Sequence, residues 1–177
     1  PSERDQGWCG NCWVWASTGA LEIENNVRSG IRDRLSIQYF NSRYNGGAGS
    51  GWACCGGWLG QFTSFYSGDT TAVPWSNAHA GYGDYYSYCE KYATAVPASS
   101  ISTEPSYTIN SISDSSVETA GTGQSVAISN IKSALNDNRP VWYAFYYGNN
   151  GWNAFENFWM SESENAVFDP NPYAVEE

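Results

Sequence analysis

The sequence is poor in histidine, methionine and positive charge. It has one His, one Met and eight Lys and Arg residues against eighteen Asp and Glu, which gives a formal net charge of −10. Phosphate backbones and anionic membrane surfaces attract basic patches, so this balance argues against a nucleic-acid-binding or membrane-surface protein. No run approaches the roughly 18 apolar residues of a membrane span. The polar start, residues 1–5, does not resemble a signal peptide, so we expect a secreted protein to be present here in processed form.

Aromatic residues, by contrast, are abundant. They make up 16% of the sequence, with nine Trp and thirteen Tyr. Disordered chains are poor in aromatic residues, so intrinsic disorder is excluded as the main state. A chain of 177 residues is long enough to bury a core as one domain or two small lobes.

The pattern of apolar residues predicts more helix in the first half and more strand in the second. The spacing predicts helices over 12–27, 35–40 with Ser36 as N-cap, 58–66 and 129–136. The aromatic and β-branched run 141–147 predicts a strand. Loops are expected over the glycine-rich residues 45–57 and over 110–125, and an irregular acidic end over 148–177. The chain is therefore predicted to be α+β, with a helical lobe over 1–95 and a β-rich lobe over 96–177.

The five cysteines form an odd set, at positions 9, 12, 54, 55 and 89. Two disulfides with one free thiol would indicate an oxidising compartment. Five reduced thiols in a cytosolic protein is the alternative. A zinc site is disfavoured because the sequence has no second C-x-x-C and no histidine near the cysteines.

One segment carries chemical information, residues 6–17 with the sequence QGWCGNCWVWAS. Its W-C-G-x-C portion is similar to the redox motif of thioredoxins, which places two thiols at a helix N-terminus. That chemistry also needs a hydrophobic strand directly upstream, and residues 1–6 are polar. A redox function would require a bond between Cys9 and Cys12 that opens and closes.

The same segment resembles the nucleophile region of the papain-like cysteine peptidases, Q-G-x-C-G-x-C-W-x-[FW]-[SA]. The similarity continues through L-S-x-Q at 35–38, the C-x-G-G-like loop at 54–57 and the helix and R-P-V segment at 131–141. It covers most of the chain, to about Tyr147. The resemblance implies a papain-like two-lobe fold, with an active-site cleft between a helical N-terminal lobe and a β-rich second lobe that is incomplete at its C-terminal end.

The resemblance also implies roles for individual residues. Cys12 would be the nucleophile at the first turn of a helix, and the Gln6 side-chain amide would assist its backbone N–H in stabilising the oxyanion. Substrate-binding residues would be Gly56, Gly57, Trp58, Leu59 and Ala144, although simple core packing is an equal alternative for Trp58 and Leu59. The implied disulfides are Cys9–Cys54 and Cys55–Cys89, which leave Cys12 free. No metal or cofactor is implied.

The pattern lacks the catalytic His and Asn of the family. The one histidine, His79, falls in the first half and is expected in an exposed loop. An unassisted thiol with a pKa near 8.5 is a weak nucleophile at neutral pH, and the leaving amine needs a proton donor. We therefore expect an inactive fragment whose His and Asn lie on further sequence or on another chain, or else a domain that lost the chemistry.

Two function classes follow. The first is an extracellular or lumenal cysteine endopeptidase that acts on peptide or protein substrates. The second is a non-catalytic structural or binding module of an extracellular assembly, which the many Trp, Tyr, Ser, Asn and Gly residues would suit.

Overall fold

A computed structural model of the chain describes residues 5–144, 149–163, 165–166 and 168–169. The elements, in chain order, are α1 (Cys12–Ser29), α2 (Ile37–Arg43), α3 (Leu59–Gly68), β1 (Thr71–Ala72), β2 (Tyr107–Thr108), α4 (Gln124–Asn136) and α5 (Asn149–Ser161). Short 3-10 helices lie at Tyr44–Gly47, Asp84–Tyr86 and Ala98–Ser100. The chain divides into two compact units, Pro1–Trp142 and Tyr143–Glu177. The predicted lobe boundary at 95/96 stays a prediction.

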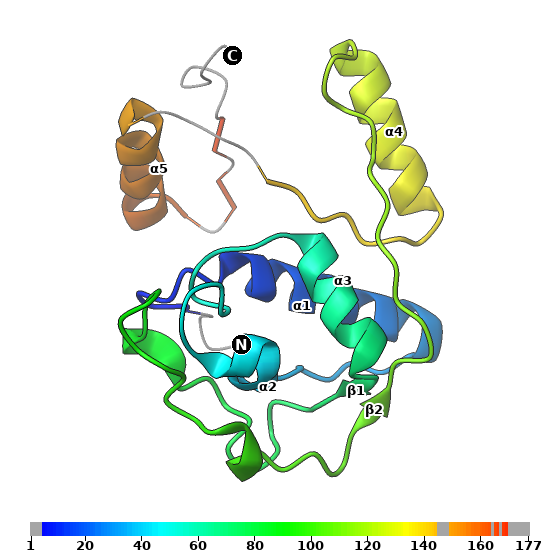
Figure 1. Cartoon of the computed structure of the whole chain (residues 1–177). Helices are drawn as coiled ribbons and strands as arrows, with labels where there is room; N and C mark the ends of the chain where they lie inside the picture. The colour runs from blue at the N-terminus through cyan, green and yellow to red at the C-terminus, as the bar shows by residue number, and fades with distance from the viewer. Residues whose placement is uncertain (1–4, 145–148, 164, 167, 170–177) are drawn as a thin grey trace. The chain divides into compact units, whose positions relative to one another are not determined.

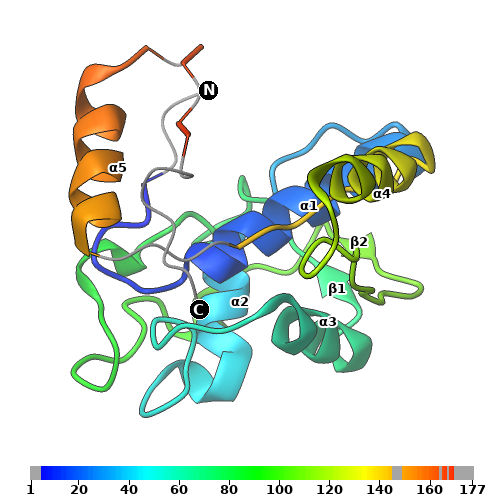
Figure 2. The same ribbon diagram turned by 90° about the horizontal axis from the view of Figure 1, so that it is seen from above.

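Helix α1 is the longest element of the first unit, and α2 and α3 pack against it. Both lie on the same side of α1 in Figure 2. The helix runs two residues beyond the predicted 12–27 and ends at Ser29, because Gly30 adopts a left-handed conformation with φ 68° and donates its N–H to the Asn26 carbonyl. The strands β1 and β2 form one short antiparallel pair, with Thr71 opposite Thr108.

Helices α1, α2 and α3 lie together in Figure 1, and aromatic rings pack between them. The ring of Phe40 in α2 lies at the centre of this cluster, 5.3 Å from the Trp13 ring of α1 and 5.2 Å from the Phe62 ring of α3. All three residues are at most 2% exposed. The apolar face of each helix is thus buried against the other two, which explains why the predicted helices form here.

Ser36 caps α2 as predicted. Its hydroxyl oxygen accepts the Tyr39 backbone N–H at 2.8 Å and donates to the Ala80 carbonyl at 2.7 Å. One buried side chain therefore satisfies a helix N–H and also ties α2 to the loop that follows β1.

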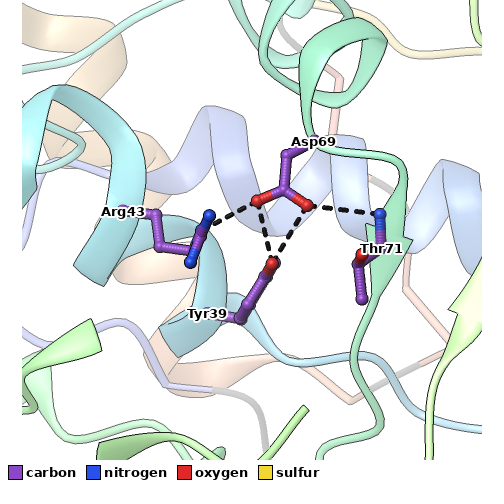
Figure 3. Close-up of polar contacts among 4 residues, drawn as sticks. All are labelled: Tyr39, Arg43, Asp69 and Thr71. Atoms are coloured by element: carbon purple, nitrogen blue, oxygen red, sulfur yellow. Dashed lines mark hydrogen bonds and ion pairs between the residues drawn. The ribbon is translucent and has the colours of Figure 1, made fainter. Parts of the chain in front are cut away.

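Asp69, the residue after α3, joins α3 to α2 and β1 (Figure 3). Its carboxylate accepts the Tyr39 hydroxyl at 2.8 and 3.0 Å and pairs with the Arg43 guanidinium at 2.7 Å. The Thr71 N–H donates to the same carboxylate at 3.3 Å. Burial and the hydrogen bond to Asp69 together raise the pKa of the Tyr39 hydroxyl to about 12.

The second half differs from the prediction. Residues 141–144 form no strand, and 145–147 lie outside the described residues. The segment predicted as irregular, 148–177, contains α5, and the helix predicted over 129–136 begins at Gln124, inside the predicted loop 110–125. Among the described residues after 95, β2 is the one β-strand. A strand needs a neighbour for its backbone hydrogen bonds, and none of the described residues pairs with 141–144.

Candidate active site

Cys12 is the first residue of α1 and is exposed. The other four cysteines form two disulfides, Cys9–Cys54 and Cys55–Cys89, which are the pairings that the resemblance implied. Cys12 is consequently the free thiol of the chain. The structure contradicts the alternative of five reduced thiols, and it also contradicts a Cys9–Cys12 redox pair and a zinc site on these cysteines.

The first disulfide fixes the glycine-rich loop against the segment before α1. Cys9 is fully buried, and Gly10 forms a parallel β-bridge with Cys55. A Cβ atom at position 10 would lie 2.7 Å from the Cys54 carbonyl oxygen, closer than such contacts allow. Glycine is therefore required at this motif position for packing, whatever its role in catalysis.

The Gln6 side chain is anchored next to this disulfide. Its amide nitrogen donates to the Cys9 carbonyl at 3.1 Å, and the Gln6 carbonyl lies 2.9 Å from the Tyr82 hydroxyl. A primary amide carries two hydrogens, so one remains for another acceptor. The predicted oxyanion role of Gln6 is compatible with this anchoring and stays a prediction.

Trp13 connects the nucleophile helix to the glycine-rich loop. Its indole N–H donates to the Ala53 carbonyl at 3.0 Å, and a Cβ atom at position 57 would lie 2.6 Å from its ring. Gly56 has φ +83°, a left-handed conformation that favours glycine. Gly56 and Gly57 are thus both required by the local fold, and their predicted contacts with substrate backbone stay a prediction.

The two predicted pocket residues after the glycines lie at the start of α3. Trp58 is 52% exposed and its ring lies 6.0 Å from that of Trp142, while Leu59 is half-buried. The structure therefore does not support core packing for Trp58. Ala144 is exposed in the second unit. The pocket that these three residues would line stays a prediction.

His79 is exposed in the loop after β1, with φ 60°. An open hollow of about 910 Å³ lies elsewhere in the first unit, beside Arg43, Phe65 and Asp69, and includes none of the predicted site residues. Within the described residues, no group of three His, Cys, Asp or Glu side chains could hold a metal ion. The same part of the chain has no helix that is long and apolar enough to cross a membrane.

Sequence reasoning missed a polar cluster beneath the start of α1. It consists of Asn11, Asn41 and Asp84, all fully buried and joined by hydrogen bonds. The one sequence signal was Asn11 itself, because asparagine directly before a helix is a preferred N-cap residue.

A group of aromatic side chains beside Cys9 was also missed. The Trp8 ring lies 6.1 Å from that of Tyr86 and 6.2 Å from that of Tyr88, and Tyr88 and Tyr92 are 4.8 Å apart. Trp8 is 67% exposed and Tyr86 is 72% exposed. The Lys91 ammonium lies over two of these rings.

Comparison with known proteins found partial matches, several of them to proteins named as cathepsins or cysteine proteases. The chain is 38% identical over 63 residues to gamete and mating-type specific protein A of Dictyostelium discoideum, and 44% identical over 52 residues to cathepsin L1 of Drosophila melanogaster. It is 37% identical over 54 residues to digestive cysteine proteinase 1 of Homarus americanus. These matches cover 36%, 25% and 28% of this chain, and 14%, 14% and 17% of the relatives.

The chain thus spans a small part of the length of these relatives, and no family model matches it. The partial matches to cathepsin L-type enzymes agree with a free cysteine at the start of a helix and a disulfide three residues before it. Over this partial region the chain is similar to cathepsin L and other papain-family cysteine proteases, which supports a papain-like family.

Proposed function

We propose that Cys12 is the nucleophile of a cysteine endopeptidase site that cleaves peptide bonds in extended substrates. One observation carries the proposal: of five cysteines, the one at the first turn of α1 is exposed and unbridged. A thiol at this position lies where unpaired N–H groups and the helix dipole favour the thiolate.

The reaction follows from this placement. The Cys12 thiolate attacks the carbonyl carbon of the substrate and forms a tetrahedral intermediate, whose oxyanion is stabilised by the Cys12 backbone N–H and the Gln6 amide. The intermediate collapses to an acyl-enzyme as the amine leaves with a proton, and water then releases the acid. Substrate backbone would lie along Gly56 and Gly57, with a side chain in a pocket lined by Trp58, Leu59 and Ala144.

The proposal requires a proton donor for the leaving amine. The one histidine of this sequence, His79, is an exposed loop residue. The proposal therefore needs a proton donor other than His79, and we expect the 177 residues alone to have little activity. The two disulfides support an extracellular or lumenal site of action.

The test is the reactivity of Cys12. We expect a peptidyl vinyl sulfone and iodoacetamide both to modify Cys12 in the folded chain, at rates above those for the thiol of free glutathione at neutral pH. Peptide mapping without reduction identifies the modified residue, and Cys12→Ser gives the background. Gln6→Ala should slow reaction with the peptidyl reagent while leaving iodoacetamide largely unaffected, because only the peptidyl reagent is held in the substrate site, where a sulfonyl oxygen can accept from the Gln6 amide.

A Cys12 thiol that reacts no faster than glutathione would contradict the proposal. The same holds for a chain that reacts equally fast after denaturation in urea, since the fold would then contribute nothing to the thiol.

The exposed aromatic group Trp8, Tyr86, Tyr88 and Tyr92 favours a second candidate, a non-catalytic binding module. Exposed Trp and Tyr side chains are typical of interaction surfaces. This candidate predicts an unreactive Cys12, so the labelling experiment separates the two.

A further inference from the structure

The Asn11 side chain does not cap α1, although its position directly before the helix predicts that it would. Asn11 is the N-cap residue of α1, and asparagine there usually accepts a first-turn N–H through its side-chain oxygen. In this structure it makes no such hydrogen bond and is fully buried. The Asn11 oxygen accepts the Trp15 indole N–H at 3.1 Å and lies 3.4 Å from the Tyr82 hydroxyl.

The other end of the Asn11 amide is held by a relay that ends at a carboxylate. Asn11 Nδ2 donates to Asn41 Oδ1 at 3.1 Å, and Asn41 Nδ2 donates to Asp84 Oδ2 at 2.9 Å. We call Asp84, Asn41 and Asn11 the Asp84 relay. An ionised carboxylate can only accept and an indole N–H can only donate. The two ends of the relay therefore fix the orientation of both amides between them.

Asp84 is fully buried, and among the described residues no basic group forms an ion pair with it. Hydrogen bonds take the place of the missing cation: Gln38 Nε2 donates at 2.9 Å, the Ala95 N–H at 2.6 Å, and the Thr94 hydroxyl at 3.1 Å. A buried charge needs such donors, so Asn41 is strongly bound to Asp84.

The consequence lies at the first turn of α1. Val14 N–H and Trp15 N–H both donate to the Asn11 carbonyl, at 2.8 and 3.1 Å. Within the described residues, no acceptor is found for the N–H of Cys12 or Trp13. A capping Asn11 side chain would accept the Trp13 N–H, the second N–H of the helix, and the relay keeps the Asn11 side chain away from it.

We propose that the Asp84 relay is a positioning device for Cys12: it retains the Asn11 amide in the core, so that the Asn11 side chain does not accept the Trp13 N–H and the positive end of α1 acts on the Cys12 thiolate. This inference rests on the proposed function, because it concerns the reactivity of the same thiol. Asn41 and Asp84 are positioning residues that act through Asn11 and do not touch substrate.

The test compares two single variants with their combination. Asn41→Leu removes the group that holds Asn11, whose side chain can then cap α1. Because interactions at a helix end are worth up to about a tenfold change, we expect the iodoacetamide rate of Cys12 at neutral pH to fall about three- to tenfold. Asn11→Ala cannot cap, so the single variant and the double variant Asn11→Ala/Asn41→Leu should both react at about the wild-type rate. The pH at which the thiolate ultraviolet absorbance of Cys12 appears, measured with Cys12→Ser as blank, should rise in Asn41→Leu and return in the double variant. The titratable groups near this site are Tyr82, which contacts Asn11, and Asp5 and Asp84, which act on Tyr82.

The recovery in the double variant is the decisive readout. If the relay were only structural, the double variant would react as slowly as Asn41→Leu, and that outcome would overturn the proposal. An unchanged rate in Asn41→Leu would also overturn it. Asn77→Ala is the matched control. This substitution also removes two hydrogen bonds of a side-chain amide, to the Ser102 and Pro105 carbonyls, but it lies outside the relay.

Trp15→Phe is a milder route to the same comparison if Asn41→Leu does not fold. It removes the indole N–H that holds the Asn11 oxygen, together with part of the ring that packs against Trp75 and Tyr82, and Asn11→Ala should again restore the rate. A wild-type Cys12 that is no more reactive than glutathione would instead contradict the proposed function itself. The two failures are thereby distinguished.

Discussion

Tyr39 shows how one residue makes the stability of this protein depend on pH. It is 3% exposed, and its hydroxyl donates to both oxygens of Asp69. Burial first and the Asp69 hydrogen bond second raise its pKa from 10.0 to about 12. Burial also raises the pKa values of Tyr66 and Tyr82. A tyrosinate at position 39 would lose its hydrogen bond and face a carboxylate.

We therefore expect stability to fall on the alkaline side. Below pH 10 Tyr39 is protonated in the folded and unfolded states, and its contribution is complete. Between pH 10 and about 12 the unfolded state ionises first, so the free energy of unfolding decreases and the contribution is lost above the folded pKa. Urea unfolding at a series of pH values measures this decrease. In Tyr39→Phe the free energy of unfolding should fall less steeply with pH, and some decline should remain because Tyr66 and Tyr82 are still present. Equal slopes for wild type and variant would contradict this assignment.

At the scale of elements, α2 depends on a single hydroxyl. Ser36 satisfies the first-turn N–H of Tyr39 and also binds the Ala80 carbonyl, which ties α2 to the loop after β1. Both bonds are buried, so water cannot replace them.

Ser36→Ala should accordingly lower the free energy of unfolding by about 1–2 kcal/mol, more than a typical exposed cap. Chemical denaturation with far-ultraviolet circular dichroism measures the change. Ser36→Thr retains the hydroxyl and should recover most of the loss. A Thr variant as unstable as the Ala variant would indicate that packing, and not the hydroxyl, determines the stability here.

The helices of the first unit could be predicted because their signals are local. Gly30 directly follows α1 and Ser36 directly precedes α2. Within both helices, apolar residues recur at helical spacing. Helix α5 could not, because its first residues, Asn149, Asn150 and Gly151, are poor helix formers. A strand at 141–144 failed for the opposite reason: its residues favour β structure, but pairing depends on a distant segment.

At the scale of the whole molecule, two covalent bonds organise the first unit. The Cys55–Cys89 disulfide joins residues 34 apart, and Cys9–Cys54 joins residues 45 apart. Loops of this length restrict the unfolded chain by about 4 kcal/mol per disulfide in the chain-entropy model.

Removing the second disulfide with Cys55→Ser/Cys89→Ser should therefore destabilise the chain by up to about 4 kcal/mol. Thermal and urea unfolding of the variant and wild type measure the difference. Cys12→Ser is the matched control and should leave stability nearly unchanged, because Cys12 is exposed and unbridged. A loss in the control similar to that in the double variant would contradict this division between structural and reactive cysteines.

The candidate site was only partly readable from sequence. The positions of Cys12, Gln6 and the disulfides could be anticipated because they share one short motif and a known pattern. The Asp84 relay could not, since Asn11 is 30 residues from Asn41, which is 43 residues from Asp84. Such contacts exist only once the chain has folded, and neither amide carries a signal of its partner.

Cys54 and Cys55 are neighbours in sequence but belong to different disulfides. No endoprotease that spares the bond between them can separate the two bridges, so a non-reducing digest leaves the peptides around positions 9 and 89 attached to one common fragment. A mispaired isomer with the two half-cystines exchanged would give a fragment of identical mass. Mass alone therefore cannot verify the pairing of this protein, and fragmentation between the adjacent half-cystines is needed to assign it.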